Sequence, residues 1–127
     1  MKGIKFFYYF SLTGLFILYL FPGSLIGYLL YEDFGKQPDF IPNPIGTSIN
    51  HALAFFYISI LGLISYMRDK SFNQTTTFLI SLSIILELSH YFIPNRSFQF
   101  LDLFGNLLGT LLAILIIAFY KKYKKIL

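Results

Sequence analysis

The side chains best suited to chemistry gather in one stretch of the sequence, between Glu87 and Gly109. Glu87 and His90 stand near the end of one apolar run, and Asp102 and Asn106 stand at the start of the next. On helices, the first pair would share a face at i, i+3 spacing and the second pair at i, i+4 spacing. A carboxylate beside a histidine suits proton transfer, so Glu87 and His90 are the candidate catalytic pair if the protein is an enzyme.

Two basic side chains complete this group. His51 opens an earlier apolar run, and Arg96 lies in the short turn between Glu87 and Asp102. Ionisable residues within apolar segments of membrane-spanning length are costly and usually functional. The histidines and the arginine would donate hydrogen bonds to an anionic group, while the carboxylates and the amide hold them in position. We therefore expect a ligand-binding site made of His51, Glu87, His90, Arg96, Asp102 and Asn106.

The same residues also have structural interpretations, which the sequence leaves open. Glu87 and Arg96 would form an ion pair that ties a helix to its outer turn. Asp102 would cap the start of its helix, where the helix dipole favours an anion. Asn106 would hydrogen-bond Glu87 or a backbone carbonyl of a neighbouring helix.

We expect neither a metal nor another cofactor. Glu87 and His90 have the Glu-x-x-His spacing of helical carboxylate sites, but those sites need two copies and further glutamates, and this sequence holds one copy. The chain has no cysteine, which excludes disulfides and thiolate ligands. No recognisable nucleophile motif accompanies the pair. We therefore favour a binding protein over an enzyme. If the protein is an enzyme, Glu87 and His90 are the only catalytic candidates that the sequence offers.

The composition indicates what kind of scaffold positions these residues. Of the 127 residues, 56% are hydrophobic and 13% are charged, with 16 Phe and 10 Tyr. A soluble domain this small could not bury so much apolar surface. The apolar residues fall in long runs without helical periodicity, which indicates that lipid surrounds the helices. The sequence therefore predicts an all-α integral membrane protein that forms a single domain over residues 1–127.

Four apolar segments are expected to cross the membrane as a bundle of four transmembrane helices. They cover about residues 6–21, 47–67, 75–93 and 100–120. The first should break near Pro22, with residues 25–31 extending it or lying at the membrane interface. Residues 32–50 are rich in proline and glycine and should form a loop. In the fourth segment, Gly105 and Gly109 form a GxxxG motif that would let this helix pack closely on a neighbour.

The basic residues predict the orientation of the bundle. With four spans, one side of the membrane holds eight Lys and Arg residues, and the other side holds Lys36 and Arg96 alone. Basic residues favour the cytoplasmic side, so both termini should be cytoplasmic and the loop 32–50 should face outward. Because the positive charges gather at segment ends, we do not expect nucleic-acid binding. Tyrosines near the segment ends should lie at the membrane interfaces: Tyr8, Tyr9, Tyr19, Tyr28, Tyr31, Tyr91, Tyr120 and Tyr123.

The spacing of the polar residues resembles the VanZ-like family of small bacterial membrane proteins. The shared positions are Glu87, a polar residue at 90, Pro94, Arg96, Asp102, Asn106 and Gly109, with His51 in the upstream stretch NHALAFF. The resemblance runs from His51 to the end of the fourth segment. It departs at His90, where the family usually has glutamine, and at Ala113, where a glycine is often found. Thr47 and Ser48 stand where an acidic–basic pair commonly precedes the histidine.

This resemblance implies a role in the cell envelope and no particular catalytic mechanism. The family is named for a protein associated with low-level resistance to the glycopeptide teicoplanin. We therefore expect a multi-pass protein of the bacterial cytoplasmic membrane that binds or protects an anionic lipid or envelope head group at an outward-facing site. The expected partners are membrane lipids, a cell-wall precursor or lipoglycopeptide, and a second copy or another membrane protein. The alternatives are an intramembrane enzyme acting on an envelope lipid and a purely structural scaffold.

Overall fold

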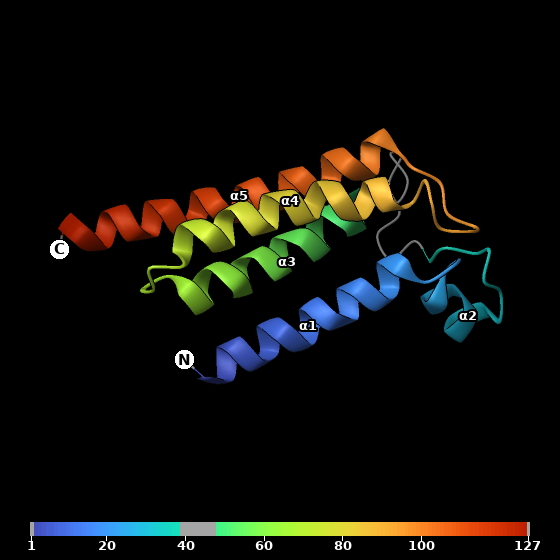
Figure 1. Cartoon of the computed structure of the whole chain (residues 1–127), viewed down its shortest axis with the longest axis horizontal. Coiled ribbons are helices and arrows are strands. Elements are labelled where there is room, and N and C mark those ends of the chain that lie inside the picture. The colour runs from blue at the N-terminus through green and yellow to red at the C-terminus, as the bar shows by residue number, and fades with distance from the viewer. Residues whose placement is uncertain (1, 39–47, 127) are drawn as a thin grey trace.

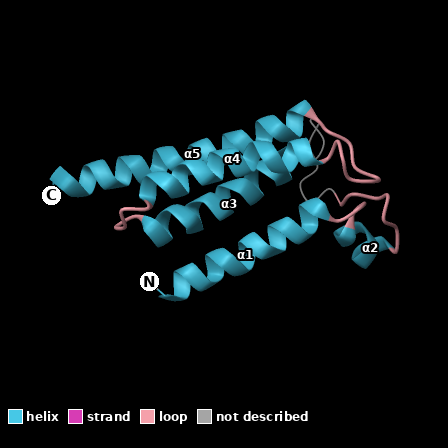
Figure 2. Ribbon diagram, in the orientation of Figure 1, coloured by secondary structure: helices cyan, strands magenta, loops and turns pink. Residues whose placement is uncertain are grey.

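The computed structural model of the chain describes residues 2–38 and 48–126, with the backbone alone for 125 and 126. Five helices and their connecting loops make up this part of the chain (Figures 1 and 2). The helices are α1 (Lys2–Leu20), α2 (Leu25–Tyr31), α3 (Ser48–Tyr66), α4 (Phe72–Ser89) and α5 (Phe100–Ile126). The fold of the described residues is therefore all-α, as the sequence predicted.

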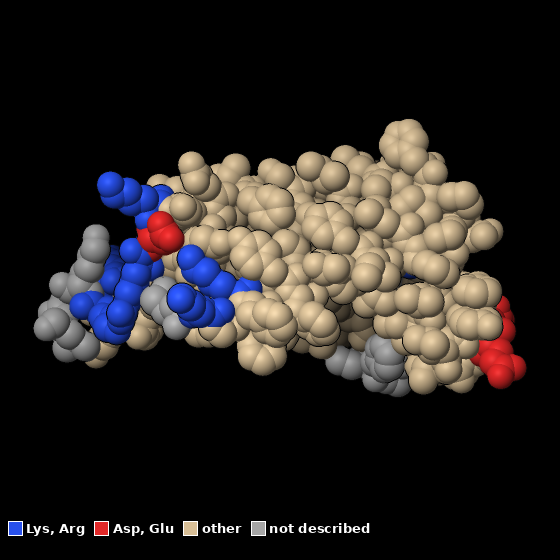
Figure 3. Space-filling view, turned by 60° about the horizontal axis from the view of Figure 1, so that its bottom comes forward, with Lys and Arg blue, Asp and Glu red and all other residues tan. Residues whose placement is uncertain are grey.

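The four long helices alternate in direction along the chain. α1 and α4 run one way, and α3 and α5 run the other way (Figure 1). Both chain termini lie at one end of the bundle, and α2 lies at the opposite end. α5 packs along α3 and also contacts α4, while α1 packs mainly against α3. Lys and Arg side chains gather at the end that carries the termini, with an acidic side chain among them, and further acidic side chains lie at the α2 end (Figure 3).

The first apolar run forms two helices. α1 ends at Leu20, just before Pro22, and the chain then turns at Gly23, which has a φ of 99° that glycine adopts without strain. α2 begins after Ser24, whose side-chain oxygen accepts the backbone N–H of Gly27 at 2.9 Å. Residues 25–31 are therefore a separate short helix and do not continue α1.

The later helices differ from the expected ranges at their ends. α4 begins three residues earlier than expected and ends at Ser89, four residues before position 93. Residues 90–92 continue α4 as a tighter turn, in which each backbone N–H bonds to the carbonyl three residues earlier. Pro94 and the φ of 60° at Asn95 then redirect the chain. α5 continues to Ile126, beyond the expected end at 120. The expected start of the second segment, residue 47, lies outside the described residues.

The surface of the bundle is suited to lipid. α1, α3 and α5 are each long and apolar enough to cross a membrane, whereas polar residues in the first turns of α4 lower its mean hydropathy. Large apolar side chains point outward, such as Phe10 at 70% exposed and Phe119 at 69% exposed. Small polar side chains are fully buried inside instead, namely Ser59, Ser83 and Thr110. This arrangement is typical of a membrane protein.

One face of α5 lies directly against the backbone of α3. Gly105 faces the carbonyl oxygen of Ser48, and Gly109 faces the carbonyl oxygen of Ala52 and the backbone nitrogen of Phe56. A Cβ atom at either glycine would overlap these backbone atoms. The two helices can therefore approach this closely only because the positions are glycine.

A tyrosine makes the matching contact between α1 and α3. Tyr8 is 3% exposed, and its ring packs over Gly62, where a Cβ atom would come within 2.8 Å of the ring. The expectation that Tyr8 lies at the membrane interface is therefore wrong. The ring packs inside because α3 has no side chain at the contact point.

We predict opposite effects for two glycine-to-alanine substitutions. Gly109→Ala should lower the free energy of unfolding by about 1–3 kcal/mol, because the new methyl group forces α5 away from α3. Gly14→Ala should raise it by about 0.5–1 kcal/mol, because nothing lies within 4 Å of its added Cβ and alanine favours helix. Unfolding in detergent, followed by circular dichroism, measures both. Shifts of the same sign would contradict the close contact.

Candidate functional site

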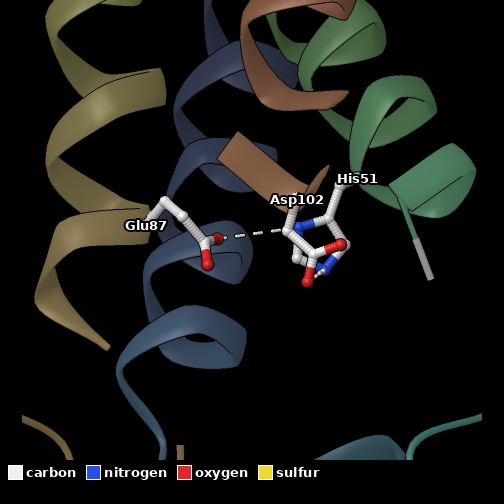
Figure 4. A group of neighbouring side chains, drawn as sticks. All are labelled: His51, Glu87 and Asp102. Atoms are coloured by element: carbon white, nitrogen blue, oxygen red, sulfur yellow. Dashed lines mark ion pairs between the residues drawn. The ribbon is translucent and has the colours of Figure 1, made fainter. Parts of the chain in front are cut away.

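Six polar side chains meet at the α2 end of the bundle, about one turn inside the ends of α3, α4 and α5. We call this group the polar layer: Tyr19, His51, Glu87, His90, Asp102 and Asn106. Three of them face one another across three helices, as Figure 4 shows for His51 of α3, Glu87 of α4 and Asp102 of α5. Nδ1 of His51 lies 3.9 Å from Oε2 of Glu87, and its Nε2 lies 3.7 Å from Oδ2 of Asp102. The packing of α4 and α5 against α3 thus brings together residues that are distant in sequence.

Glu87 is fully buried in the centre of this group. Its Oε1 accepts the backbone N–H of Gln99 at 3.1 Å and lies 3.4 Å from Nδ1 of His90. Its Oε2 and Nε2 of His90 are buried and have no hydrogen-bond partner within the described residues. Buried polar atoms usually have a partner, so both atoms are candidate contacts for a ligand, an ion or a water molecule.

Asp102 lies in the first turn of α5, where the helix dipole stabilises an anion. Its Oδ1 accepts the side-chain O–H of Ser48 at 3.0 Å, and its Oδ2 faces His51. Ser48 is the first residue of α3, so this bond joins the starts of the two helices. Ser48 was not among the expected site residues, since the sequence marked it only as a departure from the acidic–basic pair that commonly precedes the histidine.

Asn106 links three helices through its amide group. Nδ2 donates to the carbonyl oxygen of Ser83 on α4 at 3.3 Å, and Oδ1 accepts the hydroxyl proton of Tyr19 on α1 at 2.9 Å. Asn106 is itself fully buried. Of the two structural alternatives offered by the sequence, the structure therefore has the bond to a backbone carbonyl.

Tyr19 is the residue that sequence reasoning placed wrongly. It was expected at the membrane interface, yet it is 7% exposed and its hydroxyl bridges Asn106 and Nδ1 of His51, the latter at 2.8 Å. Its ring also stacks on His90, with 5.3 Å between ring centroids. In the structure the buried positions Tyr8, Leu12, Leu15 and Tyr19 lie along one face of α1, but the other faces of this helix are apolar as well, so the sequence did not mark that face.

Arg96 lies beside the polar layer but does not bind Glu87. Its Nη2 donates to the carbonyl oxygen of Leu18 at 2.6 Å, and its Nε donates to that of Phe21 at 3.2 Å. These bonds satisfy carbonyls at the C-terminal end of α1, which have no partner within the helix. Burial lowers the pKa of the Arg96 guanidinium from its ordinary value, while Tyr19 and Glu87 oppose this shift. Arginine stays protonated in proteins, so the site keeps a positive charge.

A pocket of about 410 Å³ opens beside these residues. One part of its lining is apolar and comes from α1, α2 and α3: Leu15, Leu18, Leu25, Ile26, Leu53 and Ala54. The other part is polar: Tyr19, Ser24, Gln37, Asn50, His51, His90 and Arg96. The pocket therefore joins an apolar surface directly to the basic side of the site.

The bridging hydroxyl gives a testable prediction. Tyr19→Phe should lower the free energy of unfolding by about 1–3 kcal/mol, because it leaves Oδ1 of Asn106 buried without its donor. Tyr57→Phe is the matched control, since Tyr57 is 53% exposed and its hydroxyl lies 3.4 Å from that of Ser11. It should change stability by less than about 0.5 kcal/mol. Equal effects of the two substitutions on denaturant unfolding would contradict the bridging role.

Comparison with known proteins identifies the family of the chain. The family model described as VanZ/LLP1 matches residues 6–121, which include the whole polar layer and Arg96. No curated protein and no solved structure gives a significant match. The resemblance inferred from the sequence is thus confirmed over nearly the full chain. Together, the family match and the apolar helices identify the chain as a membrane protein of the VanZ/LLP1 family.

Proposed function

We propose that this protein binds the anionic head group of an envelope lipid at its polar end, with an apolar part of the same molecule in the adjoining pocket. The observation that carries this proposal is the mixed lining of the pocket. Apolar side chains such as Leu15 and Leu53 form one part of it, and Arg96, His51 and His90 form the other. A lipid has the same arrangement, with a hydrocarbon chain next to a charged group.

Arg96 would be the principal donor to the anion. Its two bonds to α1 carbonyls use two of the five guanidinium N–H groups, so three remain for a ligand. A guanidinium matches the geometry of a phosphate or carboxylate better than an ammonium does. Nε2 of His90, buried and without a partner among the residues described, is the second candidate contact. The charge and the shape of the pocket thus favour an anion of amphiphilic character.

Two classes of envelope molecule fit this description. One is a lipid-linked cell-wall precursor, and the other is a lipoglycopeptide such as teicoplanin. Either would connect the site to low-level glycopeptide resistance, which the family resemblance implies. Both classes therefore enter the binding test below as competitors.

We further propose that the bundle crosses the bacterial cytoplasmic membrane four times with both termini in the cytoplasm. α3 and α5 run in the same direction, so if both cross the membrane, α4 between them has to cross back (Figure 1). Its 18 residues extend about 27 Å at 1.5 Å per residue, close to the thickness of a bilayer core. The end with both termini carries most of the Lys and Arg residues, which favours the cytoplasmic side (Figure 3).

The orientation can be tested by cysteine labelling, because the chain has no cysteine of its own. Asp33→Cys, in the loop after α2, should react with a membrane-impermeant maleimide in intact cells. Lys124→Cys, near the end of α5, should react only after the membrane is opened. The reverse pattern would place the polar layer on the cytoplasmic side and contradict the proposed orientation.

Lipid binding is tested by removing the proposed anion donor. In detergent, Arg96→Gln should weaken binding of fluorescent phosphatidylglycerol about 10–100-fold, which corresponds to the 1.5–3 kcal/mol typical of a charged hydrogen bond. Lys36→Gln is the control, since Lys36 lies at the same end but is exposed and packs over the Tyr31 ring at 4.2 Å. It should change the affinity less than about twofold.

Three further measurements complete this test. Gel filtration and circular dichroism verify that Arg96→Gln is folded, because Arg96 also holds carbonyls of α1. Phosphatidylcholine, which has no net charge, should bind more weakly than phosphatidylglycerol. An undecaprenyl-linked precursor or teicoplanin should displace the fluorescent lipid. Unchanged affinity in folded Arg96→Gln would refute the proposal.

A further inference from the structure

The polar layer contains two buried carboxylates, Glu87 and Asp102. Glu87 is fully buried and forms no ion pair with a Lys or Arg within residues 2–38 and 48–124. Arg96 directs two of its donors at the carbonyl oxygens of Leu18 and Phe21. A second carboxylate, Asp102, is buried on the other side of His51. Carboxylates in an apolar interior are strongly destabilising unless a proton or a cation accompanies them.

A chain of hydrogen bonds determines where His51 carries its proton. Nδ2 of Asn106 donates to the carbonyl oxygen of Ser83, so Oδ1 of Asn106 faces Tyr19 and accepts its hydroxyl proton. The Tyr19 oxygen has then used its single proton, and it accepts a hydrogen bond from Nδ1 of His51 at 2.8 Å. In a neutral imidazole, the other nitrogen, Nε2, is left with a lone pair.

This lone pair faces a carboxylate oxygen. Nε2 of His51 lies 3.7 Å from Oδ2 of Asp102, which is too far for a direct hydrogen bond. Two atoms at this separation can both bind one metal ion at about 2.1 Å each. Glu87 is the third candidate donor, because His51, Glu87 and Asp102 each offer a ligand atom within 4.8 Å of the others (Figure 4). Donors of one ion lie at most about 4.2 Å apart at 2.1 Å each, so the side chains would close by less than about 1 Å on binding.

Glu87 provides an independent sign that something binds here. One of its oxygens, Oε1, is occupied by the backbone N–H of Gln99. The other, Oε2, has no hydrogen-bond partner among the described residues, although it is completely buried. Oε2 lies 3.9 Å from Nδ1 of His51, so it faces the imidazole of the same group.

We infer that His51, Glu87 and Asp102 bind one divalent transition-metal ion, with Zn²⁺ as the first candidate. One imidazole nitrogen and two carboxylate oxygens form a donor set that zinc accepts, and its two positive charges would balance the two carboxylates. Tyr19 would orient the imidazole from its far side, as the hydrogen-bond partners of metal-binding histidines do. The two carboxylates do not line the pocket, whereas His51 does and is shared with the proposed lipid site.

The inference departs from the sequence-based expectation of no metal. That expectation weighed Glu87 with His90, which are neighbours on one helix. The group found in the structure takes one side chain from each of α3, α4 and α5, and no spacing within a single segment indicates it.

Titration of the purified full-length protein with ZnCl₂ tests this site. After treatment with a chelator, calorimetry in detergent should detect one zinc per chain. Glu87→Gln and Asp102→Asn should each weaken binding at least about tenfold, and Tyr19→Phe should weaken it about tenfold without abolishing it. The matched controls are Glu32→Gln and Asp33→Asn, two exposed carboxylates at the same end of the bundle, which should bind zinc like the wild type.

Zinc should also raise the melting temperature of the wild type and both controls but not that of the Glu87 and Asp102 variants. Circular dichroism and gel filtration select the variants that fold, and His51→Gln replaces any that does not. No zinc binding by the wild type would overturn the inference. Equal zinc binding by the carboxylate variants and their controls would overturn it as well.

Discussion

The close approach of α3 and α5 is the contact on which the polar layer depends. Gly105 and Gly109 lie on the same face of α5 as Asp102 and Asn106, at helical spacing. Because the two glycines place α5 directly on the backbone of α3, the short side chains next to them can reach across to His51, Tyr19 and Ser83. A larger residue at either glycine would separate the helices and the polar groups together. The contact between α3 and α5 thus determines both how these helices pack and how close their polar side chains lie.

The all-helical fold followed from the sequence because long apolar runs have few other solutions in lipid. The family resemblance was equally accessible, since Glu87, Asp102 and Asn106 stand out in such runs and keep their spacing. The ends of the helices were harder to predict. α1 stops short of Pro22, and α4 passes into a tighter turn before Pro94 and Asn95 redirect the chain. These ends depend on the geometry of individual turns, and the length of an apolar run does not reveal that geometry.

The partners within the site were only partly predictable, and the reason is physical. A helix that is apolar all round does not reveal which face is buried, so a tyrosine near its end looks the same whether it meets lipid head groups or His51. Tyr19 was missed for this reason. Arg96 lies in a turn, where no helical periodicity indicates which way its side chain points. Its partners, the carbonyls of Leu18 and Phe21, are more than seventy positions away in the chain. Contacts of this kind depend on how α1 docks onto the other helices.

The hydrogen bond between Tyr19 and Asn106 joins residues 87 positions apart, and this separation has a consequence for biosynthesis. At about 5–20 residues per second, Asn106 leaves the ribosome several seconds or more after Tyr19. During that interval the hydroxyl of Tyr19 and the imidazole of His51 lack their final partner on α5. Both groups lie near the ends of their helices rather than at mid-length, so water could hydrogen-bond to them until α5 is in place. The shallow position of the site therefore allows its polar groups to stay hydrated until α5 supplies their last partners.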